Sequence, residues 1–269
     1  MAIVTVAREC GSGGEDIAKA VAKKLNYDCV SKSTIYAEME EHGKKWLEWG
    51  KELDEHVPST WERYDQSYAG YLALVEHCIY KSALKNNVVI LGRGGNFLLK
   101  DIPYALRVRI TASVDERAKT LAGTVGVNEA EARKMLKYSD HEREIFIKRA
   151  YHKDWYDPDE YDLVLNSSHM SADEVVNLIV GEIPARDRAA TLEAQETLRR
   201  LELASRVKAA IITGFHQFMP TLEVSHDGKE IVLRGVYLFS RERKKVLLDI
   251  AKRVAAPTGV RSELHFRGV

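Results

Sequence analysis

VARECGSGGEDIAKAVAKKL, residues 6–25, decides the fold of this chain, because it reads as a strand end, a glycine-rich turn and a helix start. The run AIVTVA (2–7) is continuously apolar, which is typical of a strand buried on both faces of a parallel sheet. Behind the glycines, apolar residues recur at helical spacing, at Ile17, Ala18, Val21, Ala22 and Leu25. A strand, glycine turn and helix in this order are how phosphate-binding loops are built.

Three later segments also read as buried strands: NNVVILGRGG (86–95), ALRVRITA (105–112) and YDLVLNSS (161–168). The helix that follows the second of these is expected to begin at Ser113, with Glu116 closing a capping box. Strands that alternate with helices predict an α/β fold, with a parallel sheet flanked by helices.

Residues 35–85 are helical in character, with a predicted break where Pro58 interrupts the pattern. Ser59 or Thr60 is expected to cap the next helix. MSADEVVNLIVGEI (170–183) predicts a further capped helix after the last strand of the sheet.

The character of the sequence changes after Pro184, where a charged helical stretch begins. Two strands are predicted about the Asp227-Gly228 turn, then a helix over 240–255 and a strand over 259–266. This order predicts a small α-β-β-α-β domain of the α+β class. We therefore expect an α/β domain over 1–183, a helical linker over 184–197 and the α+β domain over 198–269.

Composition describes an ordinary globular protein, with 269 residues, 45% hydrophobic, 30% charged and a formal net charge of zero. A neutral chain has no global attraction to nucleic acid or to an anionic membrane. The three cysteines lack CxxC or metal-ligand spacing, and no apolar run reaches membrane-span length, so we expect a cytoplasmic protein. No metal ligand is assigned, and five histidines are expected to be surface or satisfied core residues: His141, His152, His169, His216 and His265.

The glycine loop keeps only part of the phosphate-binding chemistry. Gly11, Ser12, Gly13 and Gly14 can present backbone N–H groups to phosphates, but the usual lysine and magnesium-binding hydroxyl are absent. Glu15 and its neighbour Asp16 are favourable at the positive end of the helix. They either occupy the place of a bound phosphate with their own negative charge or hold the metal ion directly. Arg8 is the nearest candidate cation. The alternative is a plain tight turn between strand and helix.

Two further segments carry candidate phosphate ligands. Gly92 and Arg93 lie in a second glycine turn, where an arginine can grip a phosphate bidentately. KYSDHEREIFIKRAYHKDW (137–155) is a basic helical segment that could close over phosphates as a lid. The alternatives are a surface arginine beside a turn and a solvated amphipathic helix.

Residues 1–183 resemble the cytidylate kinase-like family in three segments: RECGSGGEDIAKAVAKKLNY, VVILGRGGNFLLKDIPYALRVRITASVDERAKTLA and YDLVLNSSHMSADEVVNLI. The resemblance implies a P-loop kinase-type sheet that uses ATP and Mg²⁺ to phosphorylate a pyrimidine nucleotide such as CMP. It implies that Gly11–Gly14 face the ATP phosphates, that Arg93 faces the nucleoside monophosphate, and that Arg143 and Arg149 line a lid with Asp140 as partner. Aligned on Gly11-Ser12-Gly13, the family's lysine falls on Gly14 and its hydroxyl residue on Glu15.

The C-terminal segment GKEIVLRGVYLFSRERKKVLLDIAKRVAAPTGVRSEL resembles a BON domain, which implies an interaction or regulatory module or a self-association surface. Three hypotheses follow. The chain is an active nucleotide kinase, a non-catalytic nucleotide-binding protein with a degenerate loop, or an adaptor acting through its BON-like domain.

Overall fold

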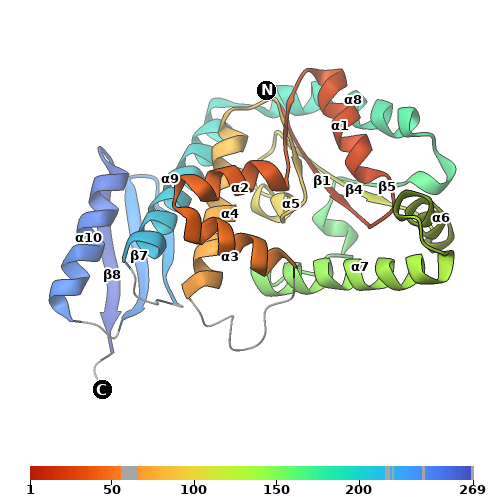
Figure 1. The fold of residues 1–269 in the computed structure, drawn as a ribbon. Helices are drawn as coiled ribbons and strands as arrows, with labels where there is room; N and C mark the ends of the chain where they lie inside the picture. The colour runs from red at the N-terminus through yellow and green to blue at the C-terminus, as the bar shows by residue number, and fades with distance from the viewer. Residues whose placement is uncertain (56–65, 216–218, 220, 238–239, 268–269) are drawn as a thin grey trace. The chain divides into compact units, whose positions relative to one another are not determined.

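The computed structural model describes residues 1–55, 66–215, 219, 221–237 and 240–267 (Figure 1). The predicted break at Pro58, with Ser59 or Thr60 as cap, lies outside these residues, as does His216. The chain divides into two compact units, one of residues 1–33 and 85–194 and the other of 34–84 and 195–269. Within the described residues, none of the helices is both long enough and apolar enough to cross a bilayer.

The first unit is built on a parallel five-stranded sheet of order β2-β3-β1-β4-β5. Its strands are β1 (Ile3–Arg8), β2 (Asp28–Val30), β3 (Val88–Leu91), β4 (Ala105–Thr111) and β5 (Leu163–Asn166). The predicted α/β fold and four of these strands are confirmed. Strand β2 was not predicted, because it has three residues and buries only Val30.

Helices cover the sheet because its central strands are apolar on both faces. Helices α1 (Gly14–Leu25) and α8 (Ala172–Ala189) pack on one face, where Ile17, Val21 and Ile179 join the strand residues in one core. On the opposite face, Gly95 of α5 (Gly95–Leu98) contacts Thr5 and Ile90 so closely that a side chain would crowd them. The remaining helices of this unit are α6 (Val114–Val125) and α7 (Glu129–Tyr151).

The predicted helix caps are largely confirmed. Ser171 and Glu174 form a full capping box at the start of α8, and Ser113 accepts a hydrogen bond from Glu116 N at the start of α6. Glu116 itself pairs with Lys119. Helix α8 continues through Pro184 to Ala189, so the change in composition at Pro184 does not coincide with a break in secondary structure.

The second unit combines a helical part with a small sheet. The helices are α2 (Lys32–Glu41), α3 (Lys44–Glu55) and α4 (Gln66–Leu84). They pack closely, because Met39 of α2 lies against Gly50 of α3, and the Trp46 ring of α3 lies against Gly70 of α4. Helix α9 (Leu192–Phe215) is followed by β6 (Glu223–His226), β7 (Glu230–Tyr237), α10 (Arg241–Ala255) and β8 (Gly259–Phe266).

The C-terminal order is the predicted α-β-β-α-β, with β6 and β7 antiparallel about Asp227-Gly228 and β8 parallel to β7. Asp227 Oδ1 accepts the N–H groups of Lys229 and Glu230, which fixes the turn. The domain limits at 183 and 198 stay predictions.

We predict that residues 198–269 fold alone, because one apolar core is built entirely from residues 203–264. A domain of this size has a net folding free energy of only a few kcal/mol. The isolated fragment should therefore unfold cooperatively at a low melting temperature, which circular dichroism measures. Leu247→Ala in the same fragment should abolish the transition, since Leu247 is fully buried in that core. A fragment without any cooperative melt would show that the core needs other residues.

Candidate phosphate-binding site

The glycine loop lies at the carboxyl edge of the parallel sheet, where β1 ends at Arg8 and β3 ends at Leu91 (Figure 1). Parallel strands collect their following loops at this edge, which is where open α/β sheets bind ligands. Gly13 caps α1 in the left-handed conformation, with φ 72°, and supplies no side-chain hydrogen bond to the helix N-terminus. The first turn of α1 thus presents backbone N–H groups that suit an anion.

Arg8 connects the glycine loop to the second glycine turn. A methyl group on Gly14 would come within 2.5 Å of Arg8 Cβ, and one on Gly92 would collide with Arg8 Nη1. The side chain therefore packs its stem on the first loop and places its guanidinium at the second. Both contacts require the absence of a side chain at these glycines.

The charge of Arg8 is poorly compensated. Burial, then the nearby charge of Arg143, lower the pKa of Arg8 to about 10. In the part of the chain that the structure describes, no carboxylate lies within ion-pair distance of this guanidinium. Glu15 raises the pKa of Arg8 only from a distance, and it pairs with Lys19 at 2.8 Å. A positive charge that remains ionised at neutral pH without a counterion favours binding of an anion.

The second glycine turn has an unusual backbone. Gly92, Arg93 and Gly94 all have positive φ angles, of 73°, 57° and 75°. Tyr151, at the end of α7, donates a hydrogen bond from its hydroxyl to Arg93 O at 2.6 Å, and its ring stacks on Phe97. This turn places Arg93 close enough to Arg8 for its charge to lower the pKa of Arg8 further.

A buried network of charges holds the loop from beneath. Glu9 accepts hydrogen bonds from Arg109 Nη2 at 3.2 Å and Ala112 N at 3.3 Å, and it lies 3.6 Å from Arg117 Nε. Asp140 accepts from Cys10 N at 3.0 Å and from Arg117 Nη1 at 2.5 Å. Asp140 thus bonds directly to the backbone of the glycine loop.

Arg143 joins this network to the loop. Its Nη1 donates to Arg8 O at 2.8 Å and lies 3.7 Å from Asp140 Oδ1, one turn earlier on α7. The structure therefore brings together Arg8, Arg93, Asp140 and Arg143. Arg149, six residues further along α7 and half-buried, keeps its lid role as a prediction.

The loop residues Ser12 and Glu15 make different contacts. The buried Ser12 donates its hydroxyl to Glu9 O at 2.9 Å, while Ser12 O accepts from the Ser167 hydroxyl, so these groups shape the loop. The pKa of Glu15 is lowered, chiefly by the hydrogen bond from exposed Lys19. An exposed ion pair of this kind is weak, so a metal ion could displace Lys19 from Glu15.

Sequence reasoning missed three residues of this site: Glu9, Arg109 and Arg117. The available signal was Arg109, which lies between Val108 and Ile110 in strand β4, because a buried arginine requires a partner. Arg109 also lies over the Trp155 ring, 4.5 Å from its centre. The partners of Arg109, Glu9 and Trp155, lie far from it in the sequence, so residue spacing within one segment could not predict these contacts.

We predict that Asp140→Asn lowers the free energy of unfolding by about 3 kcal/mol, because it leaves buried Arg117 without its nearest counterion. The decrease in the free energy of unfolding should lie near the lower end of the range known for broken buried ion pairs, since Glu9 still lies 3.6 Å from Arg117. Urea unfolding measures the change. Asp115→Asn is the matched control: its pair with Arg133, at 2.6 Å, is exposed, so the cost should stay below about 1 kcal/mol. Equal losses in the two variants would contradict a special role for Asp140.

Comparison with known proteins places this site in a family. A cytidylate kinase from Ignicoccus hospitalis is 28% identical over 181 residues, covering 66% of this chain and 97% of its own. A cytidylate kinase from Sulfurisphaera tokodaii is 25% identical over 179 residues, covering 66% and 92%. A crystal structure of an uncharacterized protein from Eubacterium ventriosum shares the fold, with a TM-score of 0.54 and 23% identity over 68% of this chain and 98% of that one.

The family model that matches is the cytidylate kinase-like family, over residues 3–169, which includes both glycine turns and the buried network beneath the loop. This match confirms the resemblance seen in the N-terminal part, whereas no comparison shows the BON-like assignment of the C-terminal segment. The chain belongs to the cytidylate kinase-like family.

Proposed function

We propose that this protein is an ATP-dependent nucleoside monophosphate kinase of the cytidylate type, in which Arg8 takes the place of the usual loop lysine. Family membership supports a nucleotide kinase, and with it the general use of ATP and a divalent metal. The observation that carries the proposal is the uncompensated guanidinium of Arg8 between Gly14 and Gly92.

The charges around Arg8 suit a polyphosphate. Arg143 and Arg93 both lower the pKa of Arg8, which means that three positive charges repel one another at the end of β1. An anion bound between them removes this repulsion, whereas a plain tight turn would not need them. Phosphoryl transfer depends mainly on positioning and charge neutralisation, which is the chemistry that backbone N–H groups and arginines supply.

Magnesium ligands are available at the mouth of the loop. Glu15 and Asp16 lie in the first turn of α1, where their exposed carboxylates would hold the ion. When bound, the ion would neutralise charge on the transferred phosphate. Arg8 and the loop N–H groups then orient the phosphates of ATP, and Arg93 binds the phosphate of the acceptor.

The choice of CMP as acceptor follows the names of the relatives, which are cytidylate kinases. Arg143 lies beside the phosphates in this proposal, and Arg149 belongs to the lid that closes over them. The BON-like domain serves as an interaction or regulatory module, in line with its separate core.

A second candidate function is nucleotide binding without catalysis. It is favoured by the first turn of α1, where Gly14 stands in place of lysine and Glu15 already pairs with Lys19. A transfer assay separates the two candidates, because both predict nucleotide binding and only the first predicts a phosphorylated acceptor.

We predict that Arg8→Met weakens ATP binding in the presence of Mg²⁺ by about tenfold to a hundredfold, the scale of one charge-assisted hydrogen bond. Methionine keeps an apolar stem against Gly14 and removes the charge. Isothermal titration calorimetry measures the affinity. Arg133→Met is the matched control, because Arg133 is an exposed arginine paired with Asp115 away from the loop, and its ATP affinity should equal that of the wild type.

The same variant should stabilise the nucleotide-free protein. Folding lowers the pKa of Arg8 from its ordinary value to about 10, mainly through burial, so the fold disfavours its charged form at neutral pH. Each kcal/mol of this desolvation and repulsion cost that the variant removes should raise the thermal midpoint by about 2–4 °C. Unchanged ATP affinity in Arg8→Met would refute the role of Arg8. A wild-type protein that binds no nucleotide would refute both candidate functions.

A further inference from the structure

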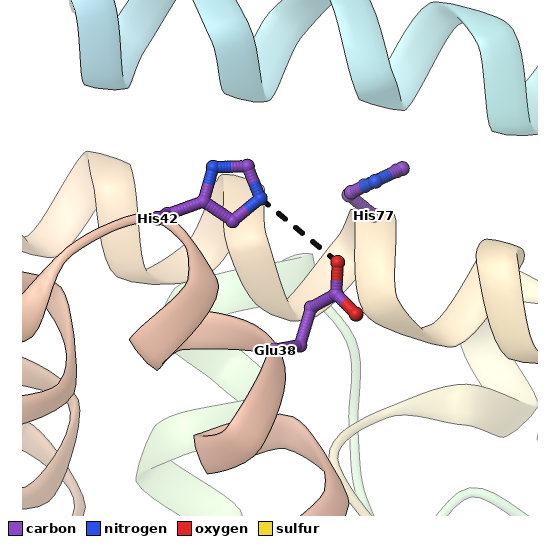
Figure 2. Close-up of side chains that lie close together, drawn as sticks. All are labelled: Glu38, His42 and His77. Atoms are coloured by element: carbon purple, nitrogen blue, oxygen red, sulfur yellow. Dashed lines mark ion pairs between the residues drawn. The ribbon is translucent and has the colours of Figure 1, made fainter.

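A cluster of nitrogen and oxygen donors lies in the second unit, outside the glycine loops. Glu38 lies on α2, His42 directly after the end of α2 and His77 on α4, and one ligand atom of each lies within 4.8 Å of the others (Figure 2). Figure 2 shows that the Glu38 carboxylate points toward the His42 ring, with His42 Nε2 3.9 Å from Glu38 Oε1. We call Glu38, His42 and His77 the α2–α4 cluster.

Local structure brings the cluster together. Glu38 lies on α2, and His42 directly follows the last residue of this helix. The chain still turns there, because His42 N donates to Met39 O at 3.1 Å, and this turn keeps the His42 ring near Glu38. Lys81, one turn after His77 on α4, donates to both oxygens of Glu38 at 2.8 Å and draws α2 against α4. The pKa of Lys81 is raised, mainly by this hydrogen bond.

His77 is an incompletely bonded buried residue. It is only 5% exposed, and its Nδ1 has no hydrogen-bond partner among the described residues. The nearest carboxylate to this atom, Glu202 of α9, lies 3.7 Å away and pairs with Arg206. A buried polar atom without a partner costs about 1–3 kcal/mol, so a group that binds the imidazole would be stabilising.

We propose that Glu38, His42 and His77 form a binding site for a divalent transition-metal ion of the Zn²⁺ class. Two imidazoles and one carboxylate are a donor set that such ions prefer, and three protein ligands leave a further position open for water or a small anion. Mg²⁺ and Ca²⁺ prefer oxygen donors alone.

Binding requires a modest rearrangement of side chains. Bonds of about 2.0–2.1 Å in a tetrahedral site place ligand atoms about 3.3 Å apart, closer than the present spacing. The Glu38 carboxylate must also give up its hydrogen bonds with Lys81 to bind the metal ion. Lys81, whose side chain is 43% exposed, can move into solvent, so it holds the carboxylate in the metal-free protein and competes with the ion.

The test is a Zn²⁺ titration of the full-length protein after chelator treatment and dialysis, in competition with a chromophoric chelator. We expect one ion per chain and a higher thermal midpoint, because an ion that binds only the folded state stabilises it. His42→Ala should weaken zinc binding by more than about 100-fold, which exceeds the loss in metal affinity expected when a residue only hydrogen-bonds to a metal ligand. His42 is 29% exposed, so its replacement should not disturb a core.

His141→Ala is the matched control. His141 lies 3.6 Å from Glu144 on an exposed part of α7, a histidine–carboxylate pair outside the α2–α4 cluster, so its loss should leave zinc affinity unchanged. Lys81→Met should tighten binding by about twofold to fivefold, since it removes the competing ion pair. No stoichiometric zinc binding, equal binding by His42→Ala, or weaker binding by Lys81→Met would each overturn the proposal.

Discussion

The buried interaction of Glu9 and Asp140 with Arg117 is the constraint on which the phosphate-binding site depends. Asp140 bonds to the Cys10 N–H group and Arg117 bonds to Cys10 O, so the loop backbone is fixed by charged groups that cannot be left unpaired. Gly11 must approach this network closely, because a side chain there would come within 2.8 Å of Arg117 O. With these charges matched beneath the loop, Arg8 remains as the uncompensated charge above it.

Much of the fold was predictable from local patterns. Continuous apolar runs identified β1, β3, β4 and β5, and Asp227-Gly228 identified the β6–β7 hairpin, because these signals depend on neighbouring residues alone. Strand β2 was missed because its pairing with β3, rather than its own sequence, makes it a strand. The composition changes at Pro184, but α8 accommodates this proline in the helix interior, so the change in composition has no counterpart in secondary structure.

The candidate site was predictable in part. The sequence indicated two glycine turns at strand ends, with Arg8 and Arg93 as candidate phosphate ligands. That the two turns meet follows from the pairing of β1 with β3, which only the structure shows. Asp140 was expected as a lid partner, which stays a prediction, and the structure adds a bond from Asp140 to the loop backbone that local sequence did not indicate. The α2–α4 cluster was not foreseen, because only the packing of α2 on α4 brings His77 to the Glu38–His42 pair.

The central claim is that an arginine at a strand end can serve a nucleotide kinase whose loop lacks lysine. The most direct measurement is ³¹P NMR of ATP, Mg²⁺ and a panel of nucleoside monophosphates incubated with the full-length protein. We expect conversion of ATP to ADP with matching formation of a nucleoside diphosphate, fastest with CMP among the acceptors. Retention of ATP with every acceptor, by a protein that calorimetry shows to bind ATP, would contradict it.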